Sequence, residues 1–154
     1  MRLALYQPDI ATNAAAAARL SACLALPLEI IEPCGFVWEA RRLRRVGLDY
    51  LERAAITRHA SFAAFERWRE GAGARLVLLS TSAETAHCEA AFEPDDVLLA
   101  GRESAGVPEE VRARADLSVR VPMAPGRRSL NVVIALAIVL GEALRQTSGY
   151  PAPG

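Results

Sequence analysis

The sequence of 154 residues has no lysine, only two histidines and only three cysteines. The cysteines, at positions 23, 34 and 88, lie far apart and form no CxxC pair, which argues against a zinc site or a disulfide framework. The two histidines, His59 and His87, leave little material for a histidine-based triad or a metal cluster. We therefore expect no metal in this protein.

Long apolar runs are also missing. No stretch approaches the ~18 consecutive apolar residues that would span a membrane, and the first residues lack the apolar core of a signal peptide. We expect a cytoplasmic protein with no membrane partner. The composition, 52% hydrophobic and 23% charged, is that of a globular protein and excludes a disordered chain. The length suits a single domain over residues 1–154, with 146–154 as a flexible tail.

The charges balance, with 18 basic against 18 acidic residues, which excludes a generic polycation for nucleic acid. Because lysine is absent, every basic residue is arginine. Either the codon bias of a GC-rich genome or selection for bidentate phosphate contacts would produce this pattern. Four arginines gather at positions 41, 42, 44 and 45 and two more at 127 and 128, so a neutral chain can still present one basic face.

Strand-like and helix-like segments alternate along the chain. Short apolar runs predict buried strands over residues 3–6, 28–31, 75–79, 96–100 and 117–121. Helices are predicted over 14–26 with Asn13 as N-cap, over 62–70 with Ser61 as N-cap, from Pro108 to about residue 115, and from Ser129 to Arg145. Residues 41–46 suggest a further short helix, and 50–56 are ambiguous, with a strand as one interpretation. This alternation predicts an α/β fold, a mostly parallel sheet flanked by helices on both faces.

In such sheets, ligands bind beyond the carboxyl ends of the strands. No GxxxxGKS/T, GxGxxG or GxSxG motif follows a strand, which excludes the common nucleotide-binding and hydrolase sites. Three loops stand out instead: residues 8–13, which lead into the helix that carries Arg19, residues 101–108, and residues 121–131. Each alone is a weak signal, because Gly101 is equally suited to end a strand and Ser129 to cap a helix.

Several stretches form a more specific pattern when their order and spacing are taken together. They are LYQPDI at 5–10 with Asn13 and Arg19, IIEPCGF at 30–36, RLRRVGLDY at 42–50, GRESAGVP at 101–108, VPM at 121–123 and SLN at 129–131. This pattern resembles the SPOUT superfamily of RNA methyltransferases, and within it the small TrmL-like (YibK-like) tRNA ribose 2′-O-methyltransferases. The resemblance covers about residues 2–147, and VPM followed by SLN at the start of a long helix is its most specific part.

The resemblance implies a deep trefoil knot in the C-terminal third of the fold and a homodimer whose sites are completed near the subunit interface. It implies S-adenosylmethionine as the methyl donor, with S-adenosylhomocysteine as product. The donor would be held mainly by backbone groups at Leu79, Gly101, Val121, Met123, Ser129 and Leu130. The implied substrate is the wobble nucleotide, C34 or modified U34, of leucine tRNAs, which would bind through the anticodon stem-loop and be methylated at the ribose 2′-hydroxyl.

The acceptor side would be served by Arg19, Glu103 and Asn131. Because a guanidinium stays protonated, we expect Arg19 to stabilise the developing oxyanion or to clamp the adjacent phosphate rather than to act as a base. Glu103 is expected to bind a ribose hydroxyl or to pair with Arg19, and Asn131 to cap the last helix or to bond the substrate nucleotide. RNA contacts are expected at Asn13, Arg42, Arg44 and Arg45, the arginines acting through phosphates.

The sequence departs from the family in the first loop. The family's Asn-Thr-Gly-Asn is Asn13-Ala14-Ala15-Ala16 here, so a glycine and a polar side chain are both replaced by alanine. Three hypotheses therefore stay open. The first is an active wobble-ribose 2′-O-methyltransferase. The second is a weakened RNA- or donor-binding protein of the same fold, or an enzyme for another RNA position. The third is an unrelated, unknotted α/β enzyme for a small molecule.

Overall fold

The structure is a computed structural model that describes residues 1–38 and 54–152. The short helix predicted over 41–46, and with it Arg42, Arg44 and Arg45, lies outside the described residues. The same holds for residues 50–53 of the segment that gave an ambiguous pattern.

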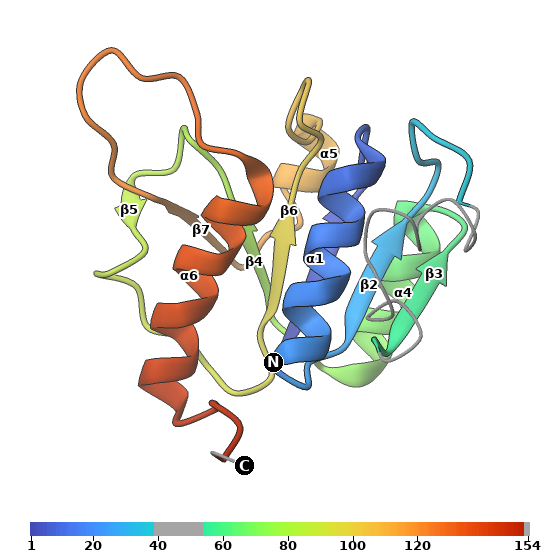
Figure 1. Ribbon diagram of the computed structural model, residues 1–154, viewed down its shortest axis with the longest axis horizontal. Helices are drawn as coiled ribbons and strands as arrows, with labels where there is room; N and C mark the ends of the chain where they lie inside the picture. Colours follow the sequence, from blue (N-terminus) through green and yellow to red (C-terminus); the bar gives the residue numbers. More distant parts are fainter. Residues whose placement is uncertain (39–53, 153–154) are drawn as a thin grey trace.

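In the described part of the chain, seven strands form one sheet in the order β3-β2-β1-β6-β4-β7-β5, and every paired neighbour is parallel. Figure 1 shows β6 at the centre of this sheet. The strands are β1 Arg2–Tyr6, β2 Leu28–Ile31, β3 Ile56–His59, β4 Leu76–Leu79, β5 Thr85–Ala86, β6 Val97–Ala100 and β7 Leu117–Arg120. The predicted parallel sheet is confirmed.

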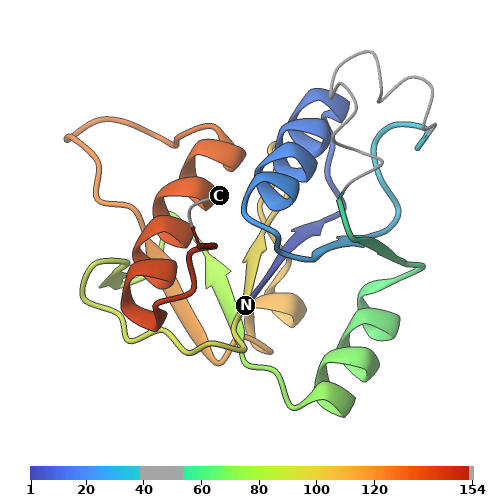
Figure 2. The same ribbon diagram turned by 60° about the horizontal axis from the view of Figure 1, so that its bottom comes forward.

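The central strands β4 and β6 are apolar throughout because both faces of the sheet are covered. In β1, Leu3 and Leu5 face one layer of helices, whereas Ala4 and Tyr6 face the other. The helices are α1 Ala11–Cys23, α4 Phe62–Ala72, α5 Glu109–Arg112 and α6 Val132–Thr147. α1 and α6 cover one face, and α4 and α5 cover the other, as Figures 1 and 2 show.

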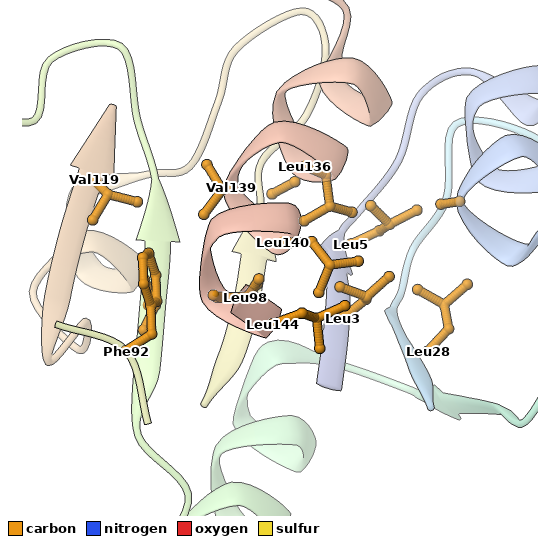
Figure 3. Close-up of a cluster of buried hydrophobic side chains, with 14 of the residues drawn as sticks. Leu3, Leu5, Leu28, Phe92, Leu98, Val119, Leu136, Val139, Leu140 and Leu144 are labelled. Atoms are coloured by element: carbon orange, nitrogen blue, oxygen red, sulfur yellow. The ribbon is translucent and has the colours of Figure 1, made fainter. Parts of the chain in front are cut away.

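The larger core lies between α6 and the sheet. Leu136, Leu140 and Leu144, one turn apart on α6, are buried against Leu3 and Leu5 of β1 (Figure 3). This spacing places the leucines on one stripe of the helix. Full burial of each leucine stabilises the fold by about 1.5–3 kcal/mol, so the start of α6, beside the central strands, is firmly placed.

Two helix starts differ from the prediction. α1 begins at Ala11 with Ile10 as N-cap, so the prediction that Asn13 caps this helix is wrong. α6 begins at Val132, and its N-cap is Asn131, whose Oδ1 accepts from the N–H groups of Val133 and Ile134 at 2.9 and 3.3 Å. Because Asn131 serves as the cap, Ser129 precedes the helix instead of starting it. The predicted cap at Ser61 is confirmed, since its Oγ accepts from the N–H of Ala64.

The final helix also ends later than predicted. α6 continues to Thr147, and the side chain of Gln146 accepts from the N–H of Phe92 and donates to the carbonyl of Ala90. The first two residues of the predicted tail therefore belong to the helix. No helix within the described ranges is long and apolar enough to cross a membrane.

The chain path around β7 is the part of the fold that positions the site. β7 lies beyond β4, yet the loop 121–131 brings the chain back so that α6 packs against α1 and β6. Figure 1 shows this loop rising above the sheet before it enters α6. The trefoil knot implied by the resemblance stays a prediction.

Candidate functional site

A pocket of about 580 Å³ opens beyond the carboxyl ends of β6, β4 and β7. This is the edge where parallel α/β sheets bind ligands, and the volume falls in the usual range for small-molecule sites. All six residues predicted to hold the donor line it: Leu79, Gly101, Val121, Met123, Ser129 and Leu130. Asn13, Glu103 and Asn131 line the same pocket, so the three loops singled out in the sequence meet here.

The loop after β6 is a tight hairpin built on two glycines. Arg102 and Gly106 exchange backbone hydrogen bonds in both directions at 2.9 Å, and Gly106 has a φ of +64°. A Cβ on Gly101 would lie 2.6 Å from the carbonyl carbon of Gly106, closer than any side chain tolerates. The missing side chain at Gly101 therefore allows the loop to fold back across the end of β6.

A chain of hydrogen bonds connects this loop to α1 and α6. Glu103 Oε1 accepts from Asn13 Nδ2 at 2.9 Å, and Asn13 Oδ1 accepts from Asn131 Nδ2 at 3.0 Å. Asn131 in turn caps α6. The side chain of Asn13, which the sequence assigned to an N-cap or to RNA, is thus held between two other residues of the predicted site.

A second set of contacts holds the first loop to the same hairpin. Glu103 Oε2 accepts from the N–H of Asp9 at 2.8 Å, while the Asp9 carboxylate accepts from the N–H and the hydroxyl of Ser104 at 3.1 and 2.5 Å. The hydroxyl and then the amide of Ser104 lower the pKa of Asp9. Asp9 is therefore a carboxylate at neutral pH and fixes the loop as an acceptor.

Polar groups after β4 form the other rim of the pocket. Arg112 of α5 donates from Nη1 to the hydroxyls of Ser80 and Ser82, at 3.2 and 2.9 Å. Sequence reasoning missed these three residues. Polar residues directly after a buried strand were a signal for the two serines, but no local pattern pointed to Arg112.

Among the predicted site residues that the structure describes, Arg19 is the one that does not line this pocket. It is an exposed residue of α1 and is not among the residues that line the pocket. It lies six positions after Asn13, about 9 Å along a helix. Of the two alanines that depart from the family pattern, Ala15 is buried and Ala16 is exposed, and neither lines the pocket. Within residues 1–38 and 54–152, no group of three or more histidines, cysteines or acidic residues is placed to hold a metal ion.

The fold and the site together define an α/β protein with a pocket of small-molecule size across the carboxyl ends of its central parallel strands. Residues 1–141 match the SpoU rRNA Methylase family, and the chain belongs to this family. Membership removes the hypothesis of an unrelated small-molecule enzyme. It also confirms the resemblance stated from the sequence motifs.

The chain is similar over its whole length to curated tRNA-modifying enzymes. It is 55% identical to a protein of Ancylobacter novellus, over 100% of this chain and 98% of the relative. It is 39% identical to a protein of Escherichia coli K12, over 98% of this chain and 96% of the relative. Both relatives are named tRNA (cytidine(34)-2′-O)-methyltransferase.

Solved structures agree with these relatives. One, described as giving structural insights into the 2-OH methylation of C/U34 on tRNA, superposes with a TM-score of 0.90 at 42% identity and covers 96% of each chain. Another is the SpoU methyltransferase AviRb from Streptomyces viridochromogenes in complex with AdoMet. It has a TM-score of 0.84 at 25% identity and covers 95% of this chain and 60% of that one.

Proposed function

We propose that this protein is a tRNA (cytidine(34)-2′-O)-methyltransferase. It methylates the ribose 2′-hydroxyl of the wobble nucleotide, C34 or modified U34, of leucine tRNAs in the cytoplasm. The observation that carries this proposal is the 55% identity to a relative of that name, over 100% of this chain and 98% of the relative. The pocket supports it, because the loops that match the family motifs meet at one edge of the sheet.

S-adenosylmethionine fits the groups that line the pocket. Leu79, Val121, Met123 and Leu130 offer an apolar slot for adenine, and polar side chains border it on two sides. When bound, the donor supplies an electrophilic methyl group for in-line displacement by the ribose oxygen. The protein's own contribution is to align the two reactants and to exclude water. The short loop across Gly101 and Gly106 and the cap of α6 provide fixed backbone for that alignment.

Glu103 and Asn131 act here through their hydrogen bonds with Asn13, which hold three loops in one arrangement. Arg19 is the group that meets the acceptor: its guanidinium stabilises the charge that develops on the 2′-oxygen or holds the neighbouring phosphate. Arg42, Arg44 and Arg45 contact the anticodon stem through phosphates, which gives affinity without base selection.

A homodimer completes the site. Ile134 and Ile138 lie one turn apart on α6 and are 54% and 38% exposed, an arrangement typical of a helix that packs against a partner. Since Arg19 stands about 9 Å along α1 from Asn13, a site completed near the subunit interface accounts for its distance from the pocket of its own chain. The final segment is threaded as a trefoil knot, as the family resemblance implies.

The deciding experiment is methyl transfer to tRNA from a strain that lacks the wobble methylation, followed by mass spectrometry of the nucleosides. We expect 2′-O-methylcytidine or its modified uridine counterpart at position 34 of leucine tRNAs. Arg19→Ala should abolish transfer and leave binding of S-adenosylhomocysteine unchanged, while the exposed Arg67→Ala serves as a matched control. Donor binding without transfer to any tRNA would favour the weakened binding protein instead, and methylation elsewhere would favour another RNA position.

A further inference from the structure

The β4 rim of the pocket carries a polar cluster that the proposed reaction has not used. Ser80 and Ser82 follow β4, and Arg112 reaches them from α5 on the far face of the sheet. The two hydroxyl oxygens lie 2.9 Å apart. All three residues line the pocket. Asn13 follows β1 and the two serines follow β4, and these strands flank β6 on opposite sides, so the Asn13 rim and the β4 rim border the pocket from different sides.

Arg112 differs from the other guanidinium groups at this pocket. Arg120 donates to the backbone carbonyls of Ala83 and Glu84, and Arg102 lies over the ring of Tyr6 at 5.7 Å. Arg112 instead shares one nitrogen between two neutral hydroxyls, and its Nε faces the Glu109 carboxylate at 3.4 Å. No acceptor among the described residues bonds to its Nη2. The cluster therefore keeps donors for a ligand while its charge is partly compensated.

We propose that Ser80, Ser82 and Arg112 bind the ribose diol of the adenosyl donor and make Arg112 a specificity-determining residue. The proposal rests on the proposed function, which supplies the donor. Besides adenine, that donor has two polar parts: the neutral diol and the charged methionine end. The methionine end branches from the sulfonium, which must face the acceptor, so it belongs with the rim of Asn13 and Asn131. The diol is left for the β4 rim.

The chemistry of the cluster suits a diol better than a carboxylate. Each serine hydroxyl both accepts and donates, and the Arg112 nitrogen already occupies an acceptor position on both. Ser80 Oγ also accepts from the N–H of Ser82, so the bond between the two hydroxyls uses the O–H of Ser80. The O–H of Ser82 and Nη2 of Arg112 can then serve two neighbouring ligand oxygens. A second carboxylate would have to share Arg112 with Glu109, whereas a neutral diol would not.

A site that bonds the diol should reject a ligand that lacks it, because its polar groups would be left unpaired. The test is calorimetric titration of the full-length protein with S-adenosylhomocysteine, its 2′,3′-dideoxyribose analogue and 5′-methylthioadenosine. Arg112→Leu should weaken the binding of S-adenosylhomocysteine about tenfold, as expected for loss of a hydrogen bond to a charged group. The same variant should weaken the binding of 5′-methylthioadenosine, which has the diol and no methionine end, by the same factor. Its affinity for the dideoxy analogue should equal that of the unaltered protein.

Two further variants separate binding from folding. Ser82→Ala should show the same ligand pattern with a smaller loss, and Arg67→Leu, which removes an exposed helical arginine away from the pocket, should bind all three ligands normally. Equal losses for S-adenosylhomocysteine and its dideoxy analogue, or an unaffected 5′-methylthioadenosine, would place Arg112 at the methionine end and overturn the proposal. Normal binding by Arg112→Leu would also overturn it while leaving the proposed function intact. Failure of the unaltered protein to bind any adenosyl ligand would remove the proposed function and this inference together.

Discussion

The two ends of the hydrogen-bond chain through Glu103, Asn13 and Asn131 fix the direction of every bond within it. The Glu103 carboxylate only accepts, and the N–H groups at the start of α6 only donate. Glu103→Gln places an amide donor against either Asn13 or the N–H of Asp9. Turning the Asn13 amide moves the conflict to Asn131, and turning Asn131 opposes the N–H groups of α6. Every arrangement of the three amides therefore leaves one pair of like groups, two donors or two acceptors, facing each other.

The magnitude follows from the hydrogen bonds that the change removes. A hydrogen bond to a charged group contributes about 1.5–3 kcal/mol, and this one is partly buried, so Glu103→Gln should destabilise the protein by about 2 kcal/mol. Asn13→Asp alone sets a second carboxylate where the 2.9 Å bond to Glu103 now lies and should cost a similar amount. Combined, the new amide donates to the new carboxylate, which still accepts from Asn131. The double variant should therefore lie within about 1 kcal/mol of the unaltered protein, a coupling of about 3 kcal/mol.

The assay is urea unfolding of all four proteins at pH 7 and one protein concentration, because a dimer makes stability concentration-dependent. A double variant destabilised by the sum of the two single changes would refute the directional chain. Methyl transfer by the double variant gives a second result. Recovered stability with recovered transfer makes Glu103 a positioning residue, whereas recovered stability without transfer means that its carboxylate contacts the substrate.

Three further changes test other parts of the structure. Gly101→Ala should force the hairpin away from Gly106 and weaken S-adenosylhomocysteine at least tenfold in calorimetry, and an unchanged Kd would contradict the close approach. Ile134→Asp should convert the proposed dimer to a monomer in sedimentation velocity, and a persistent dimer would exclude this face. Burial acts to raise the pKa of Glu66, but its two arginine partners outweigh it and the pKa lies below 4.5. Glu66→Gln should therefore cost about 2 kcal/mol at pH 7 and flatten the loss of stability that the unaltered protein shows as pH falls below 4.5, whereas parallel urea midpoints at pH 7 and 3.5 would refute the linkage.

The parts of the sheet that could be predicted are those buried on both faces. Leu76–Leu79 and Val97–Ala100 are uninterrupted apolar runs because helices cover them from both sides. Leu28–Ile31 is also fully buried, and its one polar residue, Glu29, is paired with Arg2 and His59. The edge strands gave no such run: β3 is ITRH and half exposed, and β5 has two residues. Their strand conformation depends on pairing with β2 and β7, which only the assembled sheet supplies.

The predicted helix boundaries were wrong where a candidate N-cap side chain bonds to a residue distant in the sequence and not to the start of its own helix. Asn13 has the propensity of an N-cap, but its amide spans from Glu103 to Asn131, 90 and 118 residues away. The sequence offered both Asn131 and Ser129 as the N-cap of the final helix. Asn131 is the N-cap in the structure, and its side chain also donates to Asn13. The three loops were singled out by their position after predicted strands and then by the family motifs. Arg112, in contrast, reaches the pocket from a four-residue helix. Local sequence carries no information about that reach.

The structure also limits what Ala15 and Ala16 can affect. Ala15 is 1% exposed on α1, where an added methyl group relative to glycine contributes packing and helix propensity. Ala16 is exposed and stands outside the pocket, so a polar side chain at this position would serve RNA and not the donor. Donor affinity therefore cannot distinguish an active enzyme from a weakened one. Restoring asparagine at position 16 should leave the affinity for S-adenosylhomocysteine unchanged, and a gain confined to the KM for tRNA would identify this position as part of the RNA surface.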